Sequence, residues 1–274
     1  MARRKPPSMP GTMAPGRLPK AALLAIGLCM PEAQYFLAAC LFLGAVLYTS
    51  VEHAGASAYI AAMALFSVPA AVMRPTALAL NILAASFGSV RYVRAGYFRW
   101  RTVWPFLLGS VPFAFIGGGF HLPGEFYRPL VGAILVFAGV RLLWKPNFDS
   151  QPEITDPPIW VGIGLGAVVG FLAGLTGTGG GIFLSPVVIF MGWAKVREAS
   201  GCAAIFILGN SIAGLAGNFA AVQSLPPELP LYAGAVFAGA LIGTTFGTRF
   251  AVHHIQRALG LVLLIAGAKL IGVY

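Results

Sequence analysis

Charge is the scarcest property of this sequence. Only 9% of its 274 residues are charged, and eight of them are Asp or Glu, whereas about 25% of the residues of a soluble domain are charged. A chain that is 58% hydrophobic has too few polar residues to cover a soluble core. Its apolar runs match the length of about 20 residues that a membrane-spanning helix needs. The composition therefore predicts an all-α integral membrane protein without a large soluble domain.

The usual signatures of catalysis and metal binding are missing as well. The three cysteines lie in apolar surroundings without a C-x-x-C pair, which indicates neither a disulfide framework nor a zinc site. No H-E-x-x-H occurs, and no Lys-Ser/Thr follows the glycines of Gly177–Gly181, so a nucleotide-binding P-loop is not predicted. The sequence has no basic face or DNA-binding motif. We therefore expect no enzyme activity, no metal, no cofactor and no nucleic-acid partner.

The basic residues, which give a net charge of +10, gather at the N-terminus and in loops between apolar runs. In a membrane protein such clusters are first an orientation signal. We interpret residues 1–32 as a basic cytoplasmic tail with an interfacial segment, and residues 146–158 as a polar linker. The linker separates a first transmembrane half, residues 33–145, from a second half, residues 159–274.

The two halves are similar in sequence. Residues 128–143 align with residues 256–271, and an Ala-Gly-x-basic motif falls in register. The aligned pairs are Gly132/Gly260, Gly139/Gly267 and Arg141/Lys269. Related halves with interrupted helices are typical of secondary transporters. The predicted fold is a polytopic helical bundle of two homologous halves, with broken or re-entrant helices at a central Gly-rich site.

The basic loops also predict a topology. If the first two apolar stretches of each half form one broken crossing, the chain crosses the membrane eight times and the halves are parallel. Residues 91–101 and the linker then face the cytoplasm, whereas Lys195 and Arg197 face outside. Ten full crossings would place residues 91–101 outside, so the excess of basic residues on cytoplasmic loops favours eight.

A glycine cluster interrupts the first long apolar run of the second half. Gly179, Gly180 and Gly181 are poor helix residues, and freed backbone groups find no water inside a membrane. Such a break is tolerated where it is packed in protein or lines a polar cavity, and broken helices form the binding sites of many transporters. The exposed N–H groups of the helix that starts there would attract an anion.

Close packing is the alternative reading of these glycines, because small residues let membrane helices approach each other. The four-residue spacing of glycines from Gly162 to Gly174 is a packing ladder of this kind. The cluster of three consecutive glycines, flanked by Thr176 and Thr178, exceeds what a ladder requires.

Glu52 and His53 occupy the corresponding place in the first half. Ionisable residues at membrane depth are costly and usually functional, and a His–Glu pair can take up a proton and couple it to anion movement. The alternative is a helix end at the membrane–water interface, where Glu52 caps the next helix.

Polar residues within apolar helices complete the candidate site. They either bind an oxyanion or hydrogen-bond across helices. Two arginines that follow the broken segments, Arg74 and Arg197, attract anions into an outer vestibule or are ordinary loop charges. The predicted substrate-binding residues are Thr178, Gly179, Gly180, Gly181, Asn210, Ser211, Asn81 and Ser57.

The segment Gly177-Thr-Gly-Gly-Gly-Ile-Phe-Leu-Ser-Pro186, followed by Lys195-Val-Arg-Glu-Ala199 and Gly209-Asn-Ser-Ile-Ala-Gly214, resembles the sulfite exporter TauE/SafE family of membrane permeases. The resemblance in layout runs from about Tyr35 to Tyr274. It implies transport of small sulfur-containing anions, such as sulfite or organosulfonates, across the cytoplasmic membrane. Family members often carry a similar Gly-rich break in the first half, where this chain reads Glu52-His-Ala-Gly-Ala-Ser57.

From these observations we expect a secondary transporter in a bacterial inner membrane, coupled to an ion gradient. A small anionic substrate and the lipid bilayer are its expected partners, and a homo-oligomer is left open. The alternatives are a proton-linked cation or metal permease that uses Glu52 and His53, and a non-transporting membrane scaffold.

Overall fold

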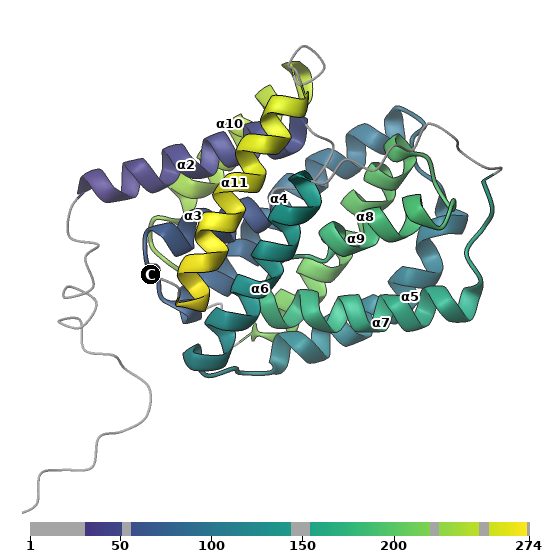
Figure 1. Ribbon diagram of the computed structural model, residues 1–274, viewed down its shortest axis with the longest axis horizontal. Coiled ribbons are helices and arrows are strands. Elements are labelled where there is room, and N and C mark those ends of the chain that lie inside the picture. Colours follow the sequence, from purple (N-terminus) through teal and green to yellow (C-terminus); the bar gives the residue numbers. More distant parts are fainter. Residues whose placement is uncertain (1–30, 51–55, 144–153, 220–224, 247–251, 273–274) are drawn as a thin grey trace, which may run out of the picture. The chain divides into compact units, whose positions relative to one another are not determined.

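The computed structural model describes residues 31–50, 56–143, 154–219, 225–246 and 252–272. Glu52 and His53 lie outside the described residues. The chain divides into two units, Met1–Tyr35 and Phe36–Tyr274. Of the first unit only the first residues of α2 are described, and the architecture below is that of the second (Figure 1).

Where the structure describes the chain, every regular element is a helix, as predicted. The helices are α2 (Pro31–Ser50), α3 (Ala56–Leu65), α4 (Ala70–Arg94), α5 (Trp100–Gly119), α6 (Gly124–Leu143), α7 (Ile159–Thr176), α8 (Gly181–Phe190), α9 (Val196–Gly217), α10 (Leu229–Phe246) and α11 (Val252–Ile271). A helix satisfies its backbone hydrogen bonds within one segment, which the bilayer interior requires. Six of these helices, α2, α4, α5, α6, α7 and α9, are long and apolar enough to cross a membrane.

The helices of the two halves follow the same order of lengths. In each half a long helix precedes a short one, α3 or α8, of ten residues, and three longer helices follow. At 1.5 Å per residue, ten residues fall well short of a hydrocarbon core of about 30 Å. The homology of the two halves stays a prediction.

The glycine ladder of α7 packs against α5. A Cβ on Gly166, Gly170 or Gly174 would collide with the backbone of α5, and a Cβ on Gly109 of α5 would collide with Ile163 of α7. Positions along the two helices rise together, so α5 and α7 run in parallel. The packing interpretation of this ladder is therefore confirmed.

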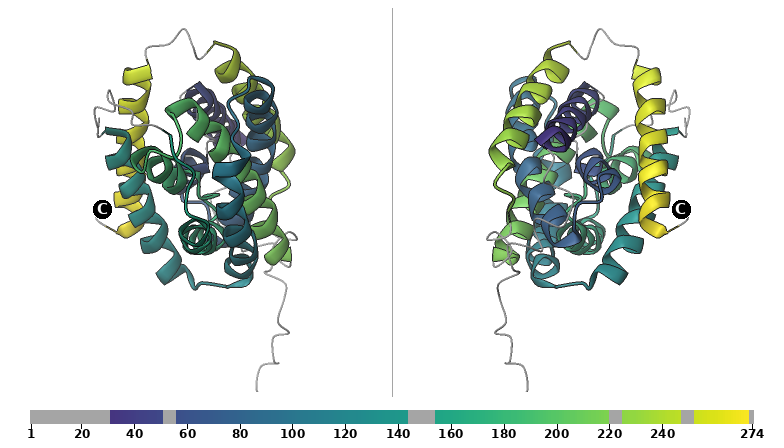
Figure 2. Two further views of the ribbon diagram at one scale, coloured as in Figure 1. Left: turned by 90° about the vertical axis from the view of Figure 1, so that its right-hand side faces the viewer. Right: turned by 90° about the vertical axis from the view of Figure 1, so that its left-hand side faces the viewer.

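The two stretches that align in sequence pack against each other in opposite directions. A Cβ on Gly132 of α6 would lie 2.8 Å from the carbonyl oxygen of Gly267 of α11, and one on Gly139 would lie 2.8 Å from that of Gly260. Helices α6 and α11 lie side by side in Figure 1 and Figure 2. Because aligned stretches run antiparallel, the expectation of parallel halves is wrong; halves related by this alignment are inverted.

Helices α7 and α8 form a hairpin that returns to the end where α7 begins. The N–H of Thr155, which precedes α7, donates to the carbonyl oxygen of Gly192, which follows α8, at 3.2 Å. The hydroxyl of Thr102, at the start of α5, donates to the carbonyl oxygen of Trp193 at 3.3 Å. The two apolar stretches are therefore not one continuous crossing, and the count of eight crossings fails in this half.

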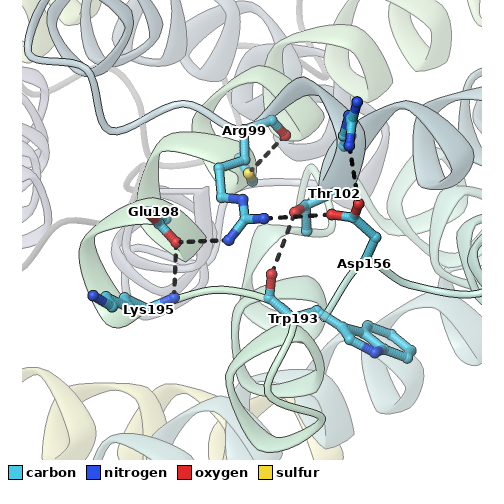
Figure 3. A network of polar contacts seen from close by, with 8 residues as sticks. Arg99, Thr102, Asp156, Trp193, Lys195 and Glu198 are labelled. Atoms are coloured by element: carbon cyan, nitrogen blue, oxygen red, sulfur yellow. Dashed lines mark hydrogen bonds and ion pairs between the residues drawn. The ribbon is translucent and has the colours of Figure 1, made fainter. Parts of the chain in front are cut away.

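A polar network gathers three segments at this same end (Figure 3). Arg99 lies 3.4 Å from Asp156 of the linker and 3.7 Å from Glu198 of α9. Arg197 donates to the hydroxyl of Tyr97 at 2.9 Å. These contacts place three segments at the same end of the helices: the loop after α4, the end of the linker and the start of α9. The predicted separation of Arg197 from residues 91–101 is therefore wrong. We call this shared end the basic end.

The glycine contacts generate a prediction about stability. Gly170→Ala should lower the melting temperature of the detergent-purified protein, because its Cβ would meet the backbone of α5 at Ser110, and overpacking of this kind costs about 1–3 kcal/mol. Gly164→Ala is the matched control on the same helix: its Cβ meets nothing within 4 Å, so stability should hold or rise. Equal melting temperatures for both variants would contradict the α5–α7 interface.

The basic end generates a second prediction, about topology. Single cysteines at Arg94 and Arg197 should both resist a membrane-impermeant thiol reagent added to whole cells, because cytoplasmic loops carry the excess of basic residues. A cysteine at Arg128, which lies at the opposite end of α5 with Arg74, should react. If only one of the Arg94 and Arg197 variants were labelled, the result would contradict their placement at the same end of the helices.

Candidate functional site

Glycine is required by the backbone at the break between α7 and α8. Gly177, which follows the last residue of α7, has φ 84°, and Gly179 and Gly180 have φ 72° and 81°. These values lie in the left-handed region, which side chains disfavour and glycine adopts freely. Residues 176–181 are all buried. The break is therefore a sharp reversal of the chain inside the protein.

The break lies beside the middle of α4 and α9. A Cβ on Gly179 would lie 3.3 Å from the hydroxyl oxygen of Ser211 and 3.5 Å from the amide nitrogen of Asn81. Asn210 also reaches this point, since its Nδ2 donates to the carbonyl oxygen of Gly179. The structure thus brings together the predicted residues Asn81, Asn210 and Ser211 around the predicted glycines.

Side chains satisfy the carbonyl groups of the break. The hydroxyl of Tyr127 in α6 donates to the Thr176 carbonyl oxygen at 2.9 Å. The Asn81 amide donates to that of Gly177 at 3.1 Å, and the Asn210 amide to that of Gly179 at 3.4 Å. Three helices therefore each supply one donor to this buried chain reversal.

The N–H groups of the break have no such partners. Among the described residues, no hydrogen bond involves the N–H of Thr178, Gly179, Gly180 or Gly181, and no side chain caps α8. The hydroxyl of Ser211 and the Oδ1 atoms of the two asparagines are also buried and have no hydrogen-bond partner among the residues that the structure describes. The side chain of Thr178 is engaged, with its hydroxyl 3.0 Å from that of Thr176. Free donors and free acceptors thus coexist around the break.

Apolar side chains close the space next to these groups. A Cβ on Gly181 would collide with Ile207 of α9, and one on Gly180 would lie 3.0 Å from both Phe206 and Val169. The cluster therefore serves close packing as well.

Arg74 connects the break to the end of α5. Its Nη1 donates to the carbonyl oxygen of Phe120 at 2.8 Å, and its Nη2 donates to those of Gly117 at 2.9 Å and Gly118. A cation at a helix C-terminus is favoured by the helix dipole. Arg74 is only 6% exposed, and its Nε has no partner within the described part of the chain.

A pocket of about 700 Å³ opens beside Arg74, where α4 and α6 begin. Its polar lining comprises Arg74, His121, Glu125, Tyr127, Arg128 and Asn218. Arg74 and Tyr127 touch both the pocket and the break: a Cβ on Gly177 would lie 3.1 Å from the Arg74 carbonyl oxygen, and Tyr127 bonds Thr176. The pocket is thus one residue layer away from the break.

The remaining predicted residues lie elsewhere. Ser57, at the start of α3, shares a hydrogen bond with Tyr48 of α2. Arg197 lies at the basic end, at the opposite end of α5 from Arg74, so the two arginines do not form one vestibule. Among the described residues no group of three or more His, Cys, Asp or Glu could hold a metal ion.

Sequence reasoning did not single out Tyr127 or Ile207. Tyr127 precedes the apolar run of α6 next to a basic residue, a position typical of an interfacial anchor, so its contact with α7 could not be inferred. Ile207 lies in an apolar helix where neighbouring residues are equally apolar. Only the packing of α8 on α9 reveals that it covers the break.

Comparison with known proteins shows that the family described as sulfite exporter TauE/SafE matches residues 36–270. The probable membrane transporter protein y4hK of Sinorhizobium fredii is 38% identical over 239 residues, which cover 86% of this chain and 97% of that protein. The probable membrane transporter protein YjnA of Bacillus subtilis is 24% identical over 216 residues, 72% of this chain and 83% of that protein. No solved structure matches.

The family match covers nearly the whole of the second unit, including the chain reversal between α7 and α8 and both helices that flank it. The relative from Sinorhizobium fredii is matched along almost its entire length. The chain belongs to the sulfite exporter TauE/SafE family and is a membrane transporter with multiple transmembrane helices.

Proposed function

We propose that the protein is a secondary transporter of a small sulfur-containing anion, sulfite or an organosulfonate, in a bacterial inner membrane. The observation that carries this proposal is an asymmetry at the break: the carbonyl groups of Thr176, Gly177 and Gly179 accept side-chain hydrogen bonds, whereas among the described residues the N–H groups of Gly179, Gly180 and Gly181 donate none. A helix start with unpaired N–H groups favours an anion, and an anion is the missing partner that would satisfy them.

The free acceptors narrow the kind of anion. The Oδ1 atoms of Asn81 and Asn210 stay unpaired because the amide nitrogens face backbone carbonyl oxygens, and a flipped amide would set oxygen against oxygen. Two free acceptors repel a fully deprotonated oxyanion but accept a hydrogen bond from a protonated one. The mixed set of donors and acceptors therefore favours hydrogensulfite, which retains a proton, over an organosulfonate, whose sulfonate group is fully ionised.

Access would run through the pocket at Arg74. An anion in this pocket meets the N-terminal ends of α4 and α6 together with the basic side chains of Arg74 and Arg128, which attract negative charge and outnumber the single acidic side chain of the lining, Glu125. From there it passes Arg74 and Tyr127 to reach the break, and displacement of Ile207 opens the site. Coupling to an ion gradient through Glu52 and His53 is part of the same proposal.

Removal of one hydroxyl tests the site. In a transport assay with reconstituted vesicles, Ser211→Ala should lower the apparent affinity for sulfite about tenfold. The reason is that a hydrogen bond to a charged group contributes about 1.5–3 kcal/mol. Ser89→Ala is the matched control, because Ser89 is another buried, unpartnered serine hydroxyl and lies toward the basic end of α4. Transport should be measured with and without an imposed pH gradient, so that coupling is read in the same vesicles.

If Ser211→Ala and Ser89→Ala had equal affinity for sulfite, the result would contradict a role of the break in substrate binding. A panel of thiosulfate, sulfate and organosulfonates in the same assay identifies the anion. Glycine-to-valine changes at the break are poor tests, because the left-handed backbone of Gly180 makes loss of folding the expected outcome whether or not an anion binds there.

A further inference from the structure

A second hollow lies at the basic end, between α4 and α10. It has a volume of about 590 Å³, and its lining comprises Ser86, Phe87, Val90, Arg91, Arg94, Ala95, Leu241 and Thr245. Phe87 of α4 contacts Phe237 of α10 edge to face at 4.8 Å between ring centroids. The last turn of α4 and the second half of α10 therefore form the two walls of a groove, which we call the α4–α10 groove.

The groove combines an apolar wall with two free cations. Phe87, Val90 and Leu241 are 38%, 52% and 49% exposed, so they offer apolar surface along it. Arg91 and Arg94 lie in the last turn of α4, and their spacing places them on one helix face. Among the described residues neither guanidinium has an ion pair or hydrogen bond, and no acidic residue lines the groove.

The hydroxyl groups of the groove are already satisfied. Ser86 donates to the carbonyl oxygen of Ile82 at 2.6 Å, and Thr245 donates to that of Leu241 at 2.6 Å. Both bonds lie within the residue's own helix and leave no donor directed at a polar ligand. The groove therefore has a positively charged end and is otherwise apolar. This arrangement is complementary to an amphiphile with an anionic head and an apolar tail.

Aromatic residues place this end at the level of the membrane surface. Trp100 begins α5 and is 59% exposed, and Trp160 in the first turn of α7 is 84% exposed. Tryptophan is enriched where membrane meets water, at the depth of the lipid headgroups. The arginines of the groove are at the same end of the helices as Trp100, one short loop away.

We propose that the α4–α10 groove binds an anionic phospholipid, with the headgroup phosphate between Arg91 and Arg94 and an acyl chain along Phe87 and Leu241. Basic pockets between transmembrane helices at the cytoplasmic surface bind anionic headgroups in this way. Because the described residues that line the groove include no acidic side chain, they offer no partner for the ammonium group of a zwitterionic lipid. The inference is independent of the transported anion.

Native mass spectrometry of the detergent-purified full-length protein tests the proposal by titration with phosphatidylglycerol and, separately, phosphatidylcholine. Phosphatidylglycerol should bind at least about tenfold more tightly, and the double variant Arg91→Gln/Arg94→Gln should lose at least about tenfold of that affinity, since each basic residue near an anionic headgroup contributes measurably. The matched control, Arg101→Gln/Lys195→Gln, removes two exposed charges at the same end but outside the groove and should change affinity less than twofold.

A second variant fills the groove and keeps its charges. Leu241→Trp should also weaken phosphatidylglycerol binding, because the added ring occupies the path of the acyl chain. Equal loss in the two double variants, or equal binding of the two lipids to the unchanged protein, would overturn the proposal. Displacement of the lipid by glycerol phosphate at equimolar concentration would also overturn it, since a free phosphate site would then explain the binding.

Discussion

The rest of the site depends on the reversal of the chain at Gly177–Gly180. Inside a membrane its backbone polar groups need hydrogen-bond partners from the protein or a ligand. Three carbonyl groups of the reversal accept hydrogen bonds from side chains on three different helices, namely Tyr127, Asn81 and Asn210. In the part of the chain that the structure describes, the N–H groups of Thr178 to Gly181 have no hydrogen-bond acceptor. A buried donor without an acceptor costs about 1–3 kcal/mol, and under the proposed function a bound anion would remove this cost.

Close approach of helices makes this arrangement sterically feasible. The glycines of α7 bring it against the backbone of α5, and α6 and α11 meet through reciprocal glycine contacts. The α5 contacts run along the length of α7, whereas α8 has ten residues and packs on Ile207 of α9. The proposed opening of the site therefore involves α8 and Ile207 rather than α7.

Much of the fold follows from apolar runs and glycine spacing. The runs predicted the helices, and the ladder of α7 predicted packing. Direction could not be predicted, because hydropathy does not reveal whether a broken helix continues or turns back; the contact between Thr155 and Gly192 decides this. Polar residues in apolar helices pointed to Asn81, Asn210 and Ser211, whereas the covering residue Ile207 has no sequence signal.

Hydrogen exchange at the break tests the central claim most directly, namely that the unpaired N–H groups receive the anion. Exchange of the peptide covering Thr178–Phe183 should be measured by mass spectrometry on the detergent-purified protein, with and without saturating sulfite. Bound anion accepts hydrogen bonds from these amides, so their exchange should slow, and the effect should weaken in Ser211→Ala. Protection confined to other segments, with unchanged exchange at Gly179–Gly181, would contradict the claim.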